Sequence, residues 1–518
     1  MKCRGGSLKI RLNEKIIRYA CIFGAVALCI ATVFIYFASF NPLGVTTVPY
    51  PLEGNITVYD PYVQQFDAFM KGQLNIDYEP SKSFLAIENP YDPDQRAGKY
   101  FLYDRAYFEG QYYSYFGTAP IFTVMLPCYY LFGALPSATA IQLVFMLIFA
   151  LFMPLLVFTV TENVTKKAHP VLLALIAYAA TVCSLQFLFG RGHTPFYYIA
   201  ATSSMAFLAT FGFLFLKGLL AKKRWSRLTL FALSGLAFAL CFHSRVNTAF
   251  AAAFAVLPCV IFGIILKKRS AADSEPSTVS QKGFAAFCKR HSVLDISLEL
   301  VALAFFVIIG FALAFAYNHA RFGSMLDFGA KYQLTIADVS TYKLRLSDFG
   351  YSVFHYFLSP LGTKENGALN LGYSAANIGH YLYVDGHFGL LAVPFMWGAF
   401  ATPFLAFDRT RSRTLRFGAL GALVGSFVIA WVDLCLGGVI YRYLCDFSLL
   451  FALLGAIGLV LVLEKALSLK KTAVRYICVC AIVLFALLSL YAVFKIMAIN
   501  NVNLLPMQKD SFFYRLFA

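Results

Sequence analysis

The sequence predicts an all-α polytopic membrane protein with about eleven transmembrane helices. Of its 518 residues, 60% are hydrophobic and 13% are charged, whereas a soluble globular domain has about 25% charged residues. Apolar runs of about 18 to 25 residues recur, and each is long enough to cross about 30 Å of hydrocarbon as a helix. The Lys and Arg residues gather in alternate loops, which is typical of cytoplasmic loops. These observations predict one integral membrane domain over residues 1–518.

Each predicted span rests on an apolar run and on the charge of the loops beside it. The spans are residues 18–40, 138–160, 171–189, 196–218, 228–247, 249–266, 296–317, 387–407, 415–436, 444–463 and 476–497. The basic loops 165–169, 217–227 and 408–416 then face the cytoplasm, with the N-terminus inside and the C-terminus outside. The net charge of +17 follows from this topology and does not indicate a nucleic-acid partner.

The loops expected outside the membrane are large and polar. Outer loop 1, residues 41–137, is expected to carry interfacial helices and a re-entrant segment at 119–135, which is short for a crossing and contains a proline. Outer loop 2 covers residues 318–386, and 267–293 is expected to be a cytoplasmic linker. The outer loops lack cysteine up to the re-entrant segment, so disulfides do not order them. With the modest chain length, this indicates a bacterial plasma (inner) membrane.

Outer loop 1 contains an acidic stretch, TVYDPYVQQFDAFMKGQLNID, just after the first span. Asp60 stands directly before a proline, which is typical of a helix N-cap. Gln64 and Asp67 then share one helical face with Asp60. We expect a short interfacial helix that shows both carboxylates outward, with Phe66 and Phe69 against the membrane surface. Capping by Asp60 and solvation of Asp67 are the structural alternative to a catalytic role.

A tyrosine-rich stretch, YDRAYFEGQYYSYFGTAPIF, follows in the same loop. Tyr113 and Tyr115 lie in it, close in sequence to Asp104. Aromatic rings with hydroxyl tips suit the lipid headgroup zone. The same rings would also stack on a sugar while carboxylates and phenols bind its hydroxyls. These three residues are therefore candidates for substrate binding.

Four arginines stand at the expected outer ends of the spans: Arg191, Arg245, Arg321 and Arg442. A single arginine at such a position usually extends its charge into the interface. Together with His193, they would instead suit a phosphate or pyrophosphate, because a guanidinium donates two parallel hydrogen bonds. Arg442, Arg245, Arg321 and His193 are candidates for substrate binding on this ground.

Two further groups of ionisable residues precede or interrupt spans. Asp433 lies inside an apolar run and is expected to need Arg442 or Arg245 as its partner. His380, Asp385 and His387 could bind a metal, but their spacing is not that of a standard site, and helix capping by Asp385 fits the sequence better. No nucleotide-binding glycine loop and no Ser/His/Asp signature is present in the sequence.

The chain resembles the membrane-integral C-type (GT-C) glycosyltransferase superfamily, and is similar to its bacterial polyprenyl-phosphate-sugar-dependent transferases and protein O-mannosyltransferases. The resemblance rests on three features. These are the basic N-terminus with one span, the acidic outer loop that opens with Asp60, and the stretch YYSYFGTAPIFTVMLPCYYLFG. The late YRYLCDF is similar to an Arg-Tyr pair of that family. The likeness covers most of the chain in topology.

The resemblance implies a polyprenyl-phosphate sugar donor, a cell-envelope glycan, lipid or protein acceptor, and a site at the outer face of the bilayer. It implies that Asp60 acts as general base and that Arg442, with Arg245 or Arg321, holds the phosphate. Many members carry paired acids in this loop, whereas here the next acid on the face of Asp60 is Asp67. The critical carboxylate, Asp60 or Asp67, and the use of a divalent cation (Mg²⁺ or Mn²⁺) therefore stay open.

The alternative function is a transporter or flippase of a lipid-linked saccharide. Such a protein would share the arginines and the aromatic residues but would need no catalytic acid. Internal repeats with helices broken in matching halves are typical of many transporters, and the sequence shows no such repeat. Transfer of a sugar, measured against movement of the same donor across a vesicle, separates the two functions.

Overall fold

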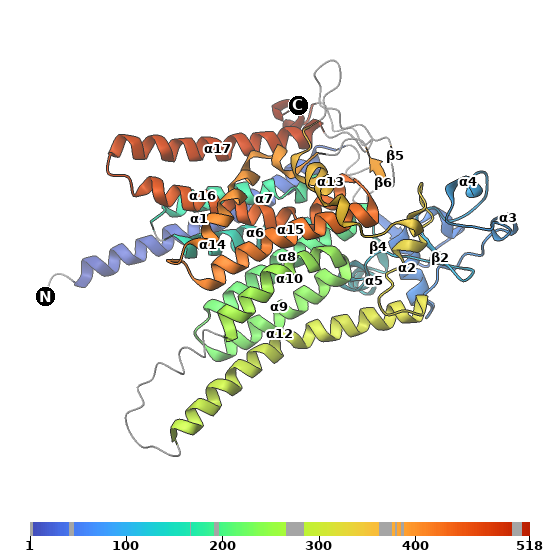
Figure 1. The fold of residues 1–518 in the computed structure, drawn as a ribbon, viewed down its shortest axis with the longest axis horizontal. Helices are drawn as coiled ribbons and strands as arrows, with labels where there is room; N and C mark the ends of the chain where they lie inside the picture. The colour runs from blue at the N-terminus through green and yellow to red at the C-terminus, as the bar shows by residue number, and fades with distance from the viewer. Residues whose placement is uncertain are drawn as a thin grey trace.

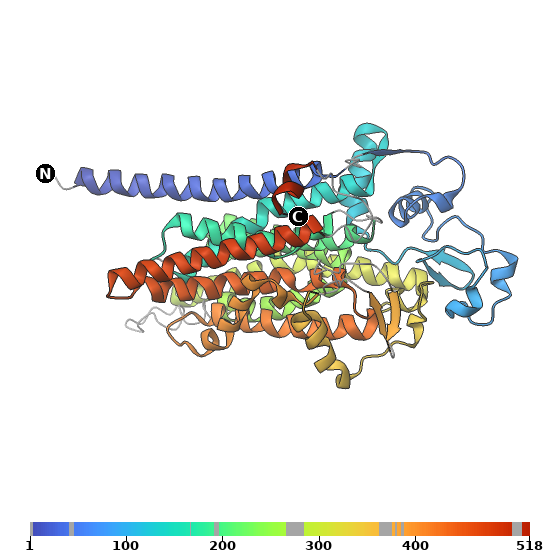
Figure 2. The same cartoon turned by 90° about the horizontal axis from the view of Figure 1, so that it is seen from above.

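The structure is a computed structural model and describes residues 4–40, 46–165, 167–190, 196–265, 284–361, 375–378, 381–384, 388–499 and 510–517. Long helices run side by side, and the short elements of the first outer loop gather at the end of the bundle opposite the one at which α1 begins (Figures 1 and 2). The long helices are α1 (Arg4–Ala38), α6 (Ala138–Val164), α7 (Pro170–Cys183), α8 (Phe196–Leu220), α9 (Arg224–Ser244), α10 (Val246–Val260), α12 (Phe284–Phe322), α15 (Arg413–Gly437), α16 (Ser448–Leu467) and α17 (Thr472–Ile499).

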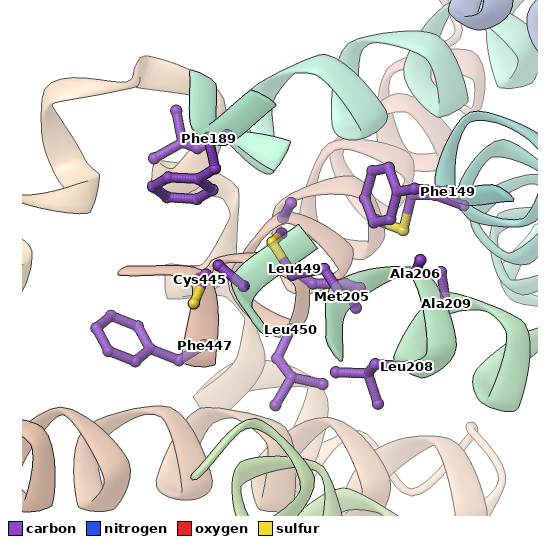
Figure 3. Close-up of a cluster of buried hydrophobic side chains, with 14 of the residues drawn as sticks. Phe149, Phe189, Met205, Ala206, Leu208, Ala209, Cys445, Phe447, Leu449 and Leu450 are labelled. Carbon is purple, nitrogen blue, oxygen red and sulfur yellow. The ribbon is translucent and has the colours of Figure 1, made fainter. Parts of the chain in front are cut away.

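The prediction of an all-α polytopic membrane protein is confirmed. In the part of the chain that the structure describes, ten helices are long and apolar enough to cross a membrane. They coincide with ten of the predicted spans. The helices bury apolar side chains against one another, and Figure 3 shows part of this core, with Phe149 of α6, Met205 of α8 and Leu450 of α16.

The eleventh predicted span, residues 387–407, is not a continuous α-helix. It contains the 3-10 helices η9 (Leu390–Ala392) and η10 (Pro394–Ala401), followed by α14 (Thr402–Phe407). A 3-10 helix rises about 2.0 Å per residue against 1.5 Å for an α-helix, so this segment still extends about 30 Å. The segment is therefore long enough to reach from the outer layer to the basic loop that follows α14.

Small residues allow η10 to pack directly on α16. A Cβ atom added at Gly398 would lie 2.4 Å from the backbone oxygen of Gly455, and one added at Gly458 would lie 2.0 Å from that of Gly398. Helix backbones inside membranes approach closely where such residues face each other. These glycines fix the position of η10 against α16.

Outer loop 1 folds into a layer of short elements (Figure 1). They are β1 (Thr47–Pro49), η1 (Ile56–Val58), α2 (Pro61–Met70), α3 (Lys82–Leu85), α4 (Pro93–Arg96), β2 (Ala106–Phe108), β3 (Gln111–Tyr113), η2 (Ile121–Met125), α5 (Leu126–Phe132) and β4 (Ala134–Pro136). β1 pairs antiparallel with β4, with Thr47 opposite Pro136, and β2 pairs antiparallel with β3. The β1–β4 pair joins the two ends of the loop at its base.

The second outer loop packs on the first. Leu334 connects them, because its carbonyl accepts from the Asp104 amide and its own amide donates to the Arg105 carbonyl, both at 2.9 Å. Its elements are η5 (Ala330–Tyr332), η6 (Val339–Thr341), η7 (Leu346–Asp348), α13 (Phe349–Val353), η8 (Phe354–Leu358), β5 (Ala375–Ile378) and β6 (Tyr381–Val384). The remaining short elements are η3 (Gln186–Gly190), η4 (Ile261–Ile265), η11 (Tyr441–Asp446) and α18 (Phe512–Phe517). The predicted linker 267–293 lies partly outside the described residues, and α12 begins within it.

The expected surface position of α2 is wrong. Its residues Pro61–Ala68 are all buried, and Phe66, at 1% exposure, packs against Tyr50 and Tyr129 with ring centroids 5.3 and 5.7 Å apart. The covering rings come from the two ends of outer loop 1, which the β1–β4 pair brings together. α2 is therefore a core helix of the outer layer, covered by protein side chains over most of its length.

Residues Ile121–Phe132 form one apolar helical stretch, made of η2 and α5, which is shorter than the ten spans. Its end is exposed, with Tyr130, Leu131 and Phe132 at 73%, 74% and 76%. Aromatic and apolar side chains exposed at this depth suit the membrane interface. The re-entrant or interfacial placement of this segment stays a prediction.

Candidate functional site

Asp60 is the N-cap of α2, as its sequence pattern predicts. Its Oδ1 accepts hydrogen bonds from the amides of Tyr62 at 2.8 Å and Val63 at 3.1 Å. An aspartate at this position satisfies amides that the first turn of a helix leaves without partners. Among the described residues no group donates to Oδ2 of Asp60, so one carboxylate oxygen is available to a ligand.

The carboxyl group of Asp60 has an upward-shifted pKa. Burial raises the pKa of the Asp60 carboxyl, while the two capping amides and the nearby guanidinium of Arg105 oppose this effect. Arg105 is itself buried and is held by Gln64, whose Oε1 accepts from Nε at 2.8 Å. A carboxylate whose pKa lies above its ordinary value is better matched to general base catalysis near neutral pH.

Asp104 is the second carboxylate of this region, and it is buried. Its backbone adopts a φ of +57°, which is uncommon outside glycine and occurs most often at Asn and Asp. The hydroxyl of Tyr115 donates to Oδ1 of Asp104 at 2.9 Å, and Tyr197 at the start of α8 interacts electrostatically with the same carboxylate. Burial and Asp104 keep the pKa of Tyr115 well above its usual range, so the phenol remains a donor.

Arg442 of η11 lies beside these tyrosines. Its guanidinium stacks over the ring of Tyr197, 4.8 Å from the centroid, and also contacts Tyr443 at 5.6 Å. Within the described ranges, the guanidinium of Arg442 makes no hydrogen bond or ion pair with another side chain or with the backbone. Stacking fixes the plane of the guanidinium and leaves its donors available for an anion.

Arg245, at the break between α9 and α10, has a buried partner. Its Nε donates to Oδ1 and Oδ2 of Asp446 at 2.6 and 2.8 Å, and Thr248 also donates to this carboxylate. In the described structure, the two terminal nitrogens of Arg245 donate to no protein acceptor. Asp446 is 0% exposed. This buried ion pair orients the guanidinium of Arg245 and leaves its terminal nitrogens for a ligand.

The two arginines and the two carboxylates belong to one region. Tyr443 interacts electrostatically with Arg442, Arg245 and Asp104, and Tyr62 interacts with both Asp60 and Arg245. These residues come from outer loop 1, the α9–α10 junction and η11. The candidate site therefore lies where the outer layer meets the outer ends of the helices.

A glycine allows this approach of the outer layer to the bundle. A Cβ atom at Gly117 would lie 2.2 Å from the backbone oxygen of His243 and 2.3 Å from that of Ser244. The neighbouring Thr118 hydroxyl is hydrogen bonded to Nδ1 of His243 at 3.0 Å. This contact places the segment that carries Tyr115 next to the residue before Arg245.

Asp433 in α15 lies below this region, inside a membrane-spanning helix. Its Oδ1 accepts from the side-chain amide of Asn247 at 2.6 Å, and it interacts electrostatically with Arg245 and Asp446. The expected direct pairing of Asp433 with Arg442 or Arg245 is not formed. An amide takes that place, because Asp446 already binds Arg245.

Asp67, which was expected on the same helical face as Asp60, pairs among the described residues with a lysine and not with an arginine. Lys71 forms an ion pair with it at 3.0 Å, and Lys71 also binds Asp77 at 2.6 Å. The Asp67 side chain is buried at 4% exposure. These contacts stabilise the C-terminal end of α2 and the turn that follows.

Arg321 and Tyr113 form a separate cluster at the end of α12. Arg321 donates to the Ser114 carbonyl at 2.7 Å and to Oδ1 of Asn318 at 2.9 Å, and Tyr113 donates to Gln111 at 2.7 Å. The bond from Arg321 to the Ser114 carbonyl joins the end of α12 to the residue that follows β3. His193 lies outside the described residues, as do Arg191, His380, Asp385 and His387.

Among the residues that the structure describes, no three His, Cys, Asp or Glu side chains lie close enough together to hold a metal ion. Oδ1 of Asp60 accepts from two backbone amides, and the Asp104 carboxylate interacts with the hydroxyls of Tyr115 and Tyr197. The positive charge at this candidate site comes from guanidinium groups.

Sequence reasoning missed four members of the region: Arg105, Tyr197, Tyr443 and Asp446. Two of them had a local signal, since Tyr197 stands in FYY at the start of a span and Tyr443 follows Arg442 directly. Asp446 stands in the same YRYLCDF stretch as Arg442, just before a span. Arg105 had no signal of its own, because its role depends on contact with Gln64 of a distant segment.

The helices and the outer layer define a polytopic α-helical membrane protein. Among solved structures, the chain is similar to the apo form of the Archaeoglobus fulgidus oligosaccharyltransferase, with 14% identity and a TM-score of 0.44 over 94% of this chain and 56% of that one. It is also similar to the complex of that protein with Zn and sulfate, with 14% identity and a TM-score of 0.43 over 92% and 53%. The chain thus spans about half the length of that protein. No family model and no curated protein matches it.

Proposed function

We propose that this chain is a glycosyltransferase that moves a sugar from a polyprenyl-phosphate donor to a cell-envelope acceptor at the outer face of a bacterial plasma membrane. One observation carries the proposal. The guanidinium of Arg442, without a hydrogen-bonding partner among the described residues, lies over Tyr197 and near Tyr443, and Tyr197 interacts with the buried carboxylate of Asp104. Such a group of donors, acceptors and rings suits a phosphate with a sugar attached to it.

The phosphate would bind to two guanidinium groups. In the described part of the chain, no acceptor binds the guanidinium donors of Arg442 or the terminal nitrogens of Arg245, whose Nε is bound by Asp446. Planar guanidinium groups bind phosphate oxygens through paired hydrogen bonds. Charge that develops on the departing phosphate would be stabilised by these two arginines, in the manner of a preorganised anion site.

The acceptor hydroxyl would approach Asp60. In the reaction, the bond from the anomeric carbon to the phosphate oxygen breaks and a bond from that carbon to the acceptor oxygen forms. The acceptor proton passes to Oδ2 of Asp60, and polyprenyl phosphate leaves with the bonding electrons. Asp104, together with Tyr115, would bind sugar hydroxyls.

Asp67 has no part in this proposal, because Lys71 neutralises it within the outer layer. Asp67 and Asp60 therefore make a matched pair for an experiment. Replacement of Asp60 by Asn keeps a cap for α2, since Asn is as good an N-cap as Asp. Replacement of Asp67 by Asn removes a charge of the same kind from the same helix.

The test is transfer of radiolabelled sugar from a polyprenyl-phosphate donor by protein in lipid nanodiscs, with a mixture of cell-envelope acceptors. We expect Asp60→Asn to lower the rate about 10²–10⁴-fold, the usual size of general base assistance. Asp67→Asn should keep most of the rate. A fully active Asp60→Asn protein would refute the assignment, and movement of intact donor across vesicles without transfer would support a flippase instead.

A further inference from the structure

A cavity of about 780 Å³ lies between α6, α8, α10, α15 and α16. It takes no part in the candidate site. Its wall is apolar over most of its area and includes Leu156, Leu216, Val256, Phe262, Ala419 and Leu453. A cavity of this character does not hold ordered water, because water needs two to four polar partners. A hydrocarbon chain would fill a cavity with such an apolar wall.

The cavity has the depth of one leaflet of a bilayer. Along α8 its lining runs from Leu208 to Leu220, which is about 18 Å at 1.5 Å per residue. Half of the hydrocarbon thickness of a bilayer is about 15 Å. Leu208 is buried and lines the cavity together with Leu450 of α16, which lies near it in Figure 3. Leu220 lies at the other end and is 46% exposed.

The polar groups of the lining gather at this exposed end. They are Asn163, Ser412, Arg413 and Thr414. This end belongs to the side of the bundle that carries the basic loops, which the charge rule places in the cytoplasm. The cavity therefore opens toward the inner leaflet, on the side opposite the candidate site.

Arg413 is the basic residue at the mouth that is available to a ligand. Its neighbour Arg411 binds Glu464, and Arg416 donates to the Ala406 carbonyl at 2.8 and 2.6 Å. Arg413 is exposed, and its side chain makes no hydrogen bond or ion pair within the described part of the chain. A cation at the inner surface attracts anionic lipid headgroups.

We propose that this cavity binds one acyl chain of an anionic glycerophospholipid from the inner leaflet, with its phosphate at Arg413. The apolar wall suits an acyl chain, and the length of the wall matches the thickness of one leaflet. Arg413 suits a headgroup with negative charge. The donor lipid of the proposed reaction would have its phosphate at the opposite side of the membrane. The proposal is therefore independent of the proposed function.

The first test fills the cavity. Leu453→Trp places a larger side chain in the wall, and Leu233→Trp on α9, where Leu233 is 45% exposed and does not line the cavity, is the matched control. Native mass spectrometry of the full chain, titrated with phosphatidylglycerol, counts bound lipids. We expect one retained lipid for the wild type and for Leu233→Trp, and none for Leu453→Trp. Equal retention by all three proteins would overturn the proposal.

The second test changes the charge at the mouth and leaves the wall intact. Arg413→Glu is compared with Arg409→Glu, because Arg409 is exposed in the same loop but does not line the cavity. Reversal at Arg413 should weaken phosphatidylglycerol binding at least about tenfold, and reversal at Arg409 should weaken it less. An unchanged affinity, or tighter binding of a polyprenyl phosphate that Leu453→Trp abolishes, would contradict the phospholipid assignment.

Discussion

Replacement of Arg442 by glutamine should remove activity while the protein stays folded. In the free protein, the guanidinium contributes mainly its two stacking contacts, with Tyr197 and Tyr443. A cation–π contact at a partly exposed position stabilises by about 0.5–1 kcal/mol, so the two together contribute about 1–2 kcal/mol. Because no hydrogen bond or ion pair of Arg442 is found among the described residues, little else is lost on substitution.

The expected loss in catalysis is larger. Two charge-assisted hydrogen bonds to a phosphate contribute about 1.5–3 kcal/mol each. Their loss in the transition state amounts to about 3–6 kcal/mol, or about 10²–10⁴-fold in kcat/KM. The assay is sugar transfer in nanodiscs, together with the thermal unfolding midpoint of the same preparation.

Arg245→Gln is the matched comparison, since Arg245 belongs to the same region but has a structural partner. Its loss leaves Asp446, which is 0% exposed, without its cation. Removal of one member of a buried ion pair destabilises a protein by about 3–5 kcal/mol. We expect Arg245→Gln to lower both the unfolding midpoint and the activity. The reasoning is refuted by an Arg442→Gln protein that transfers sugar at the wild-type rate, or that unfolds as early as Arg245→Gln.

Two other predictions concern the pKa of Asp60 and the packing of η10 on α16. Burial raises the pKa of Asp60 and Arg105 opposes this. Since a protonated Asp60 accepts no proton, transfer should fall as pH falls through a midpoint above about 3.9, the ordinary aspartate value. Arg105→Met should move this midpoint upward in a pH–rate profile, and Lys71→Met should not. Gly458→Ala should lower the unfolding midpoint, because its Cβ meets a backbone oxygen at 2.0 Å, whereas Gly24→Ala, with no atom within 4 Å, should not.

Hydropathy and charge were sufficient to predict most of the transmembrane helices, because a span is a local property of about 20 residues. The N-cap at Asp60 was predictable for the same reason, since an aspartate before a proline specifies a helix start within a few residues. The segment 387–407 was predicted as a span, but its 3-10 geometry was not. That geometry depends on the close approach of Gly398 to α16, and a contact between distant segments leaves no local pattern.

The burial of α2 was missed because the rings that cover it belong to other segments. Phe66 has the same spacing whether it meets lipid or Tyr50 and Tyr129, and only the closure of outer loop 1 by β1 and β4 decides between them. Amphipathic spacing therefore predicts that a face is buried, while the partner of that face is decided by tertiary contacts.

For the arginines, too, the sequence alone does not show which residue binds a ligand. Arg321, Arg245 and Arg442 stand at the ends of spans and have similar sequence surroundings, so composition gave no reason to rank them. The structure separates them by their acceptors: Arg321 donates to a carbonyl and an amide oxygen, Arg245 gives one nitrogen to Asp446, and Arg442 donates to no described residue. An arginine binds a ligand with the donors that the protein leaves available, which makes Arg442 the residue whose substitution best distinguishes catalysis from folding.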